Sequence, residues 1–134
     1  MEDSSQAKNP QTQAKKILII EDEYFISELY VRALKKAGYE VVLAIDGKDG
    51  LDKALTDVFD IILLDIMVPT MTGNEILDRL RQQNPPIRAK IIITTNLEQG
   101  EETKKQLEKQ ADAYIIKAEI TPKQLVEFLS NIKV

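Results

Sequence analysis

Side chains that could do chemistry together follow four of the short apolar runs in this sequence. They are Glu21, Asp22 and Glu23 after the first run, Asp65 at the end of the third, Thr94 and Thr95 at the end of the fourth, and Lys117 after the fifth. Carboxylates gathered at one place repel one another unless a cation lies among them. The chain has no His and no Cys, so a metal ion here must be held by oxygen ligands, which favours Mg²⁺, Ca²⁺ or Mn²⁺.

A structural role is the alternative for each of these residues taken singly. Asp22 or Glu23 could complement the dipole of a helix that follows the first run, and Thr94 alone is a typical strand residue. Acids, a hydroxyl and an ammonium at four strand ends are harder to explain in this way. With no basic group inside the acidic run, a hard divalent cation is the simplest balance for its charge, and Mg²⁺ leaves room for a phosphoryl oxygen.

The apolar runs themselves predict buried strands. They are continuous rather than alternating, as in strands that are covered on both faces of a parallel sheet. The five runs are Ile17–Ile20, Val41–Ile45, Ile61–Leu64, Ala89–Thr94 and Ala113–Ile116.

Amphipathic segments between the runs predict helices. Gly38 is a natural stop for the first of them, Pro85-Pro86 closes the third, and Thr121-Pro122 supplies a capping residue and a proline at the start of the last. The apolar stripes are Phe25, Ile26, Leu29, Ala33, Leu34 and Ala37 in the first; Leu51, Ala54 and Leu55 in the second; Ile76, Leu77 and Leu80 in the third; and Leu125, Phe128, Leu129 and Ile132 in the last. Five strands alternating with five helices predict a doubly wound α/β fold with a parallel sheet, and ligands of such folds bind beyond the carboxyl ends of the strands.

The fourth helix, expected from Glu98 to Gln110, has a thin apolar face that consists of Leu97, Leu107 and Ala111. Exposed pairs such as Glu101 with Lys105 and Lys104 with Glu108 would stabilise it by only about 0.3–0.5 kcal/mol each. A helix so lightly anchored directly after Thr95 is expected to be a moving part.

Composition restricts the classes of protein that remain. The 134 residues suit one domain, and apolar residues make up 43% of them, enough for a core. The net charge of −4 argues against direct binding of nucleic acid. Neither a membrane-spanning run nor an apolar signal segment is present, so we expect a cytoplasmic protein with no membrane association. Residues 1–14 are polar without periodicity and predict a disordered tail, followed by one domain over residues 15–134.

The segment from Asp65 to Gly73, DIMVPTMTG, resembles the phosphoacceptor loop of the receiver domains of bacterial two-component response regulators. Glu21-Asp22-Glu23 is similar to the acidic pair of that family. Thr95 and Lys117 lie 30 and 52 positions after Asp65, which fits the family's switch Ser/Thr and its Lys. The resemblance covers residues 15–133. Two residues depart from it, because Ala118 stands where the family has Pro and Asn96 where it commonly has Ala or Gly.

The resemblance implies a flavodoxin-like sheet with strand order 2-1-3-4-5 and a role for each site residue. Asp65 would accept the phosphoryl group, and Lys117 and the Thr95 hydroxyl would contact phosphoryl oxygens. Mg²⁺, or Mn²⁺ in its place, would be bound by Asp65, by Asp22, by Glu21 directly or through water, and by the Met67 carbonyl. Tyr114 occupies the family's aromatic switch position, although a half-buried strand aromatic is the plain alternative.

The function implied is a phosphorylation-dependent signalling switch rather than a conventional enzyme. A sensor histidine kinase would be the donor, and phosphorylation would change a surface made by the helix 98–110, the last strand and the last helix, for a downstream protein or for a dimer. The alternative is a receiver-like module that binds partners without phosphorylation. A cofactor binder or a phosphohydrolase of similar fold is disfavoured, because the acidic run would repel a phosphate and no second acid lies two residues after Asp65. No effector domain follows Val134, so a stand-alone regulator and an excised receiver both remain open.

Overall fold

The computed structural model describes residues 14–96 and 100–134. The tail predicted for residues 1–14 therefore lies outside the described residues, except for Ala14. The described strands are β1 Lys16–Ile20, β2 Glu40–Ala44, β3 Ile61–Asp65, β4 Lys90–Thr95 and β5 Ala113–Ile116. The described helices are α2 Tyr24–Lys36, α3 Gly47–Ala54, α4 Gly73–Arg81, α5 Glu101–Gln110 and α6 Pro122–Ser130, with a 3₁₀ turn, η2, at Lys117–Glu119.

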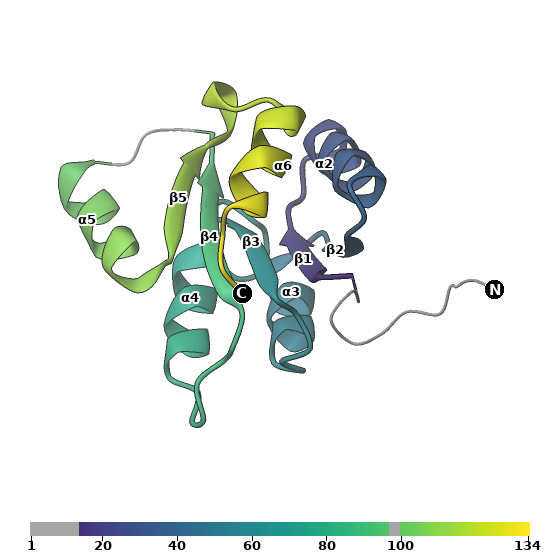
Figure 1. Ribbon diagram of the computed structural model, residues 1–134. Coiled ribbons are helices and arrows are strands. Elements are labelled where there is room, and N and C mark those ends of the chain that lie inside the picture. Colours follow the sequence, from purple (N-terminus) through teal and green to yellow (C-terminus); the bar gives the residue numbers. More distant parts are fainter. Residues whose placement is uncertain (1–13, 97–99) are drawn as a thin grey trace.

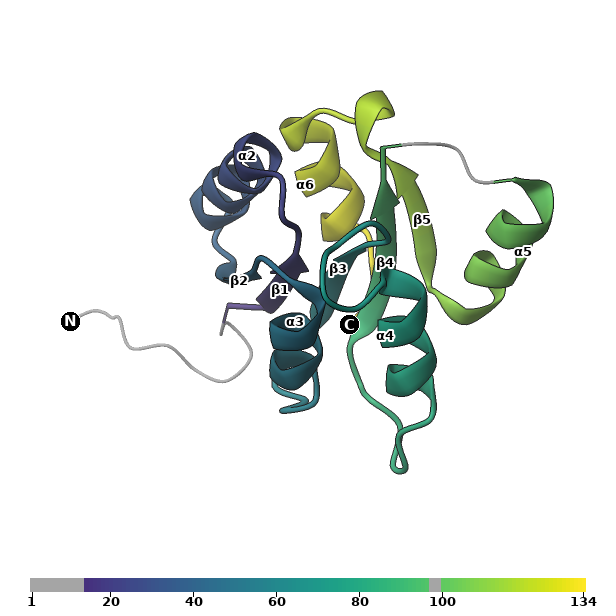
Figure 2. The same ribbon diagram turned by 180° about the vertical axis from the view of Figure 1, so that it is seen from behind.

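The strands form one parallel sheet in the order β2-β1-β3-β4-β5, which confirms the predicted fold. Strand and helix alternate along the chain, so every crossover carries a helix onto one face of the sheet (Figures 1 and 2). The register pairs Asp65 at the end of β3 with Thr94 on β4, and Thr95 with Ile116 at the end of β5. Four strand ends therefore meet at one edge of the sheet.

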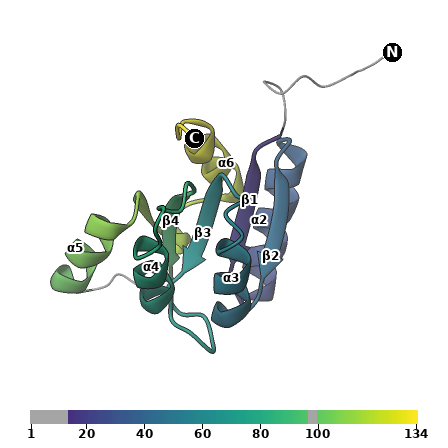
Figure 3. The same ribbon diagram turned by 90° about the horizontal axis from the view of Figure 1, so that it is seen from below.

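The core consists of two halves, one on each face of the sheet. Leu18 and Ile20 of β1 pack with α3, α4 and Leu107 of α5, whereas Ile17 and Ile19 pack with α2 and α6. Figure 3 shows α6 on the opposite side of the strands from α3 and α4. Successive side chains of a strand point to opposite faces, so a continuous apolar run supplies both halves, and each fully buried Ile or Leu contributes about 1.5–3 kcal/mol.

The sequence predictions about burial are wrong in part. β2 and β5 are the edge strands, and most of their residues are only half-buried rather than covered on both faces; Ile45, predicted as the last residue of β2, is exposed. In α2, Phe25 and Leu29 are 81% and 51% exposed, although they belong to the predicted inward stripe. The buried residues there are Ser27, Tyr30 and Leu34.

The first turn of α2 shows why Ser27 rather than Phe25 can be buried. The Ser27 hydroxyl donates to the Tyr24 carbonyl at 3.1 Å, so this polar side chain is buried with its hydrogen bond made. Phe25 lies on the outward side and packs edge to face against the exposed Tyr24 ring. The apolar spacing predicts a wide stripe along the helix. It does not predict which side of that stripe is covered by the sheet and α6.

The predicted helix ends are confirmed where they depend on local chemistry. Gly38, just after α2, has a φ of +101°, a conformation that suits glycine. Thr121 and Gln124 form a reciprocal capping box at the start of α6, with Pro122 in the first turn.

Candidate functional site

The four strand ends bring together Glu21, Asp65, Thr95 and Lys117, and all four residues are buried. Beside them opens a pocket of about 270 Å³, lined by Asp22, Glu23, Asp65, Met67, Thr95 and Asn96. Thr95, and not Thr94, is among the residues that line this pocket. The parallel sheet thus gathers into one site the residues that are separated by as many as 96 positions in the sequence.

The Lys117 ammonium lies at the centre of the acidic cluster. Its Nζ is 2.8 Å from Glu21 Oε1, 2.8 Å from Glu23 Oε1 and 3.1 Å from Asp65 Oδ2. Burial by itself would lower the pKa of Lys117, but the hydrogen bonds to Glu21 and Glu23 and the charge of Asp65 outweigh it and raise the pKa above its ordinary value. Lys117 is therefore protonated at neutral pH and balances part of the acidic charge.

The carboxylates of Glu21, Glu23 and Asp65 contact this one ammonium, and a carboxylate oxygen of Asp22 lies within 4.8 Å of oxygens of Glu21 and Asp65. Burial, followed by the charge of Asp65, raises the pKa of Glu21 to about 7 even though Lys117 opposes the shift. The sequence argument that no basic group balances the acidic run was thus incomplete, because Lys117 does so from a distant strand. One positive charge remains too few for four carboxylates.

A hard divalent cation fits the charge that is left over. One carboxylate oxygen each of Glu21, Asp22 and Asp65 lies within 4.8 Å of the other two. Glu21 and Asp65 are buried, and Asp22 is exposed at the entrance. An all-oxygen donor set that is open to solvent on one side suits Mg²⁺, which retains several waters.

The Asp65 carboxylate is held by both of its oxygens. Oδ1 accepts a hydrogen bond from the Met67 backbone N–H at 3.0 Å, and Oδ2 accepts the bond from Lys117. The following loop folds back so closely that a Cβ on Gly73 would lie 2.6 Å from the Ile66 Cα and 2.7 Å from the Asp65 carbonyl oxygen. Only glycine allows this approach, which explains the glycine at the end of the Asp65 loop.

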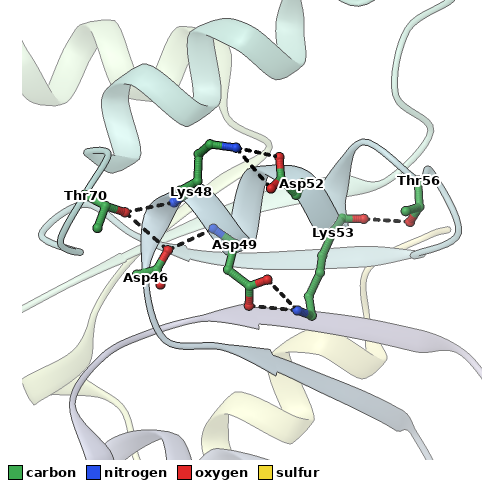
Figure 4. A network of polar contacts seen from close by, with 7 residues as sticks. All are labelled: Asp46, Lys48, Asp49, Asp52, Lys53, Thr56 and Thr70. Atoms are coloured by element: carbon green, nitrogen blue, oxygen red, sulfur yellow. Dashed lines mark hydrogen bonds and ion pairs between the residues drawn. The ribbon is translucent and has the colours of Figure 1, made fainter.

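The same loop is tied to the start of α3 (Figure 4). The Thr70 hydroxyl accepts from the Lys48 N–H at 3.0 Å and donates to Asp46 Oδ1 at 3.2 Å. Asp46 also caps α3 by accepting from the Asp49 N–H at 2.8 Å. Thr70 has a φ of +70°, which is unusual for a β-branched residue, and these bonds offset that strain.

Tyr114 on β5 lies between the core and α5. Its ring packs against the α3–α4 half of the core, and its hydroxyl is buried without a hydrogen-bond partner among the described residues. Lys104 Nζ of α5 is 5.6 Å from the ring centroid, within reach of a cation–π contact. The residue is both the predicted half-buried aromatic and a contact between β5 and α5.

The predicted ion pairs of α5 are wrong. In the part of α5 that the structure describes, neither Glu101 with Lys105 nor Lys104 with Glu108 forms a pair, and Leu107 is the buried residue of the helix. The helix is anchored at its far end instead, where Arg81 of α4 donates to the Gln110 carbonyl at 2.6 Å and pairs with Asp112 at 3.1 Å. Leu97 and Glu98, also assigned to this segment, lie outside the described residues.

Sequence reasoning missed a contact across the mouth of the pocket. Asn96 Nδ2 donates to Glu23 Oε1 at 2.8 Å, and that same oxygen accepts from Lys117. Glu23 is the N-cap residue of α2 but makes no side-chain capping bond, because its carboxylate is bonded to Lys117 and Asn96 instead. The departure at Asn96 was the one available signal. At the other departure, Ala118, the chain forms the turn η2 directly after β5.

A doubly wound α/β protein with an acidic pocket at its strand ends is the class that this geometry defines, and comparison with known proteins narrows it. The response regulator receiver domain model matches residues 17–130, and the chain belongs to this family of two-component signalling proteins. Response regulator ArlR of Staphylococcus saprophyticus is 40% identical over 119 residues, and transcriptional regulatory protein DltR of Streptococcus agalactiae is 37% identical over 118. Each match covers 88% of this chain but only 50% of the relative, so the chain spans about half the length of these relatives.

Solved structures agree with this assignment. A CheY-like receiver domain protein from Methanospirillum hungatei superposes with a TM-score of 0.76 at 33% identity, covering 87% of this chain and 91% of that one. Chemotaxis response regulator CheY4 of Vibrio cholerae has a TM-score of 0.77 at 30% identity, covering 87% and 97%. None of the helices described for this chain is both long and apolar enough to cross a membrane.

Proposed function

We propose that this domain accepts a phosphoryl group on Asp65 from a sensor histidine kinase, in the presence of Mg²⁺. One observation carries the proposal: the Asp65 carboxylate is buried, fixed by Met67 N–H and Lys117, and faces a pocket that is open to solvent. A carboxylate is a weak nucleophile, so fixed position and neutralised charge must supply most of the catalysis. The domain would act in the cytoplasm.

In the transfer step, an Asp65 oxygen bonds to phosphorus while the bond from phosphorus to the donor atom breaks. The donor atom, a kinase His nitrogen or an acetate oxygen, leaves with the electron pair. Lys117 and the Thr95 hydroxyl would then donate to phosphoryl oxygens. A bound Mg²⁺ would be held by Asp22 and Asp65, by Glu21 directly or through water, and by the Met67 carbonyl, and would neutralise phosphoryl charge. The domain would catalyse its own phosphorylation and slow hydrolysis without being a conventional enzyme.

If Asp22 is a metal ligand, replacing it should have opposite effects on stability without metal and on Mg²⁺ affinity. Asp22→Ala removes an exposed carboxylate from a crowded site, so the free energy of unfolding without metal should equal or exceed that of wild type. Mg²⁺ affinity should fall at least about tenfold, because a ligand carboxylate is lost. Urea denaturation with a chelator and Mg²⁺ titration measure the two quantities, and undiminished Mg²⁺ affinity would refute the assignment.

We propose further that phosphorylation changes the surface formed by α5, β5 and α6, to which a downstream protein or a second copy would bind. Two features support this. α5 is anchored at its C-terminal end by Arg81 but contributes only Leu107 as a buried side chain. Tyr114 has a buried hydroxyl that lacks a partner among the described residues, which costs about 1–3 kcal/mol and makes an alternative ring position accessible.

Amide exchange with and without beryllofluoride, a phosphoryl analogue, tests the switch. With Mg²⁺ present, we expect the largest change of protection in α5 and around Tyr114, because the group bound at Asp65 draws Thr95 and the following loop inward. A uniform change, or one confined to the acidic cluster, would contradict the switch. Partner binding by a chain that does not respond to beryllofluoride would instead support a module that acts without phosphorylation.

A further inference from the structure

The Glu23 side chain connects the two sides of the pocket. Its Oε1 accepts one hydrogen bond from Lys117 Nζ and another from Asn96 Nδ2, both at 2.8 Å. Glu23 follows β1, Asn96 follows β4 and Lys117 follows β5, so three strand-end loops meet at one carboxylate oxygen. We call these three side chains the Glu23 clasp.

The number of hydrogen bonds that Lys117 can donate determines how the clasp affects phosphoryl binding. An ammonium has three N–H donors, and all three are engaged, by Glu21, Glu23 and Asp65. A phosphoryl oxygen on Asp65 can be bound by Lys117 only if one of these partners gives way. The partner that leaves must be stable without the ammonium.

Burial identifies Glu23 as that partner. The side chains of Glu21 and Asp65 are 2% and 3% exposed and would also be ligands of Mg²⁺, so neither carboxylate can turn away into water. The Glu23 side chain is 44% exposed, and its carboxylate can turn into water with little loss. Glu23 therefore occupies, in the unphosphorylated domain, the N–H of Lys117 that a phosphoryl oxygen needs.

We propose that Glu23 is a specificity-determining residue that competes with the phosphoryl group for Lys117, and that Asn96 acts by holding Glu23 in that position. The inference deepens the proposed function and rests on it. A small phosphoryl anion must displace Glu23 with no compensating contacts, whereas a phosphorylated protein that docks on the domain has further binding energy with which to do so. The clasp thereby disfavours small phosphodonors.

The test compares affinities for beryllofluoride, measured calorimetrically with saturating Mg²⁺, in wild type and four variants. Glu23→Ala should bind about fivefold more tightly, the equivalent of one half-exposed ion pair. Asn96→Ala leaves the charge unchanged but removes one bond of the clasp, so it should bind about twofold more tightly. Glu119→Ala is the charge control, because Glu119 is exposed, lies two residues from Lys117 and forms no ion pair with it among the described residues; its affinity should equal that of wild type.

The double variant separates the clasp from simpler effects. If Asn96 acts through Glu23, adding Asn96→Ala to Glu23→Ala should change nothing further. Equal gains in Glu23→Ala and Glu119→Ala, or an effect of Asn96→Ala that persists without Glu23, would overturn the inference while leaving the proposed function intact. Absence of Mg²⁺-dependent binding in all five proteins would overturn the proposed function, and the inference with it.

Discussion

Replacing Asp65 with Asn should abolish phosphorylation of this domain. With acetyl phosphate and Mg²⁺, wild type should gain the mass of one phosphoryl group, and the labelling rate of Asp65→Asn should fall roughly 10³-fold or more. Asn has nearly the shape of Asp, but its one carbonyl oxygen can keep either the bond from the Met67 N–H or the bond from Lys117, not both. The ionised oxygen that attacks phosphorus is lost as well, so labelling should fail even in the folded variant.

A matched control shows whether the loss of labelling is specific to Asp65. Asp52→Asn changes an exposed acid of α3 that pairs with Lys48 at 3.2 Å (Figure 4) and does not line the pocket, and it should label like wild type. Intact-mass spectrometry over the course of labelling measures all three proteins. Full labelling of Asp65→Asn would show that the acceptor is another residue.

The part of the site that could be predicted from the sequence depends on topology. Asp65, Thr95 and Lys117 each stand at the end of an apolar run, and parallel strands place their carboxyl ends at one edge of the sheet. The convergence follows from strand order and needs no knowledge of side-chain positions. The helix ends at Gly38 and Thr121 were predictable for a different reason, because each depends on backbone chemistry within a few residues.

The part of the structure that could not be predicted from the sequence depends on contacts between side chains that lie far apart in the chain or on different sides of a helix. Glu23 was grouped with its acidic neighbours, and nothing in its sequence position indicates that Lys117, 94 residues later, would bind it. Phe25 was expected to be buried because period alone cannot tell a covered edge of a helix from an exposed one. Ion pairs on α5 were expected from i,i+4 spacing, but such pairs are weak enough that Lys104 packs over Tyr114 instead.

Replacing Lys117 with Met should produce the largest loss of stability of any change at the site. The Lys117 side chain is 2% exposed and is bonded to two carboxylates that are as deeply buried. Removing one partner of such a pair typically costs roughly 3–5 kcal/mol, because the remaining charges stay buried without compensation. Urea denaturation with a chelator present should show this loss, and Mg²⁺ should restore more stability to the variant than it adds to wild type, since the cation can take over part of the balance.

The loss in Lys117→Met should also depend on pH in a defined direction. Glu21 has a pKa of about 7 in the folded domain, against 4.5 for the free side chain, chiefly because of burial. An acid whose pKa is raised on folding binds its proton more tightly in the folded state, so stability rises as pH falls from above 7 towards 4.5. Lys117 lowers the pKa of Glu21, so without Lys117 that pKa should rise further. The loss should therefore be greatest near about pH 8 and shrink towards about pH 5.

Lys48→Met supplies the matched control for this prediction. Lys48 also pairs with a carboxylate, that of Asp52, but its side chain is 66% exposed, and the loss should stay within about 0.5 kcal/mol with no marked dependence on pH. If Lys117→Met behaved like Lys48→Met, the carboxylates around Lys117 would have to be protonated or solvated in the folded domain. Solvated carboxylates would contradict the burial of Glu21 and Asp65, and a protonated Asp65 would contradict its use as an ionised nucleophile, so this pair of variants tests the electrostatic basis of the site as a whole.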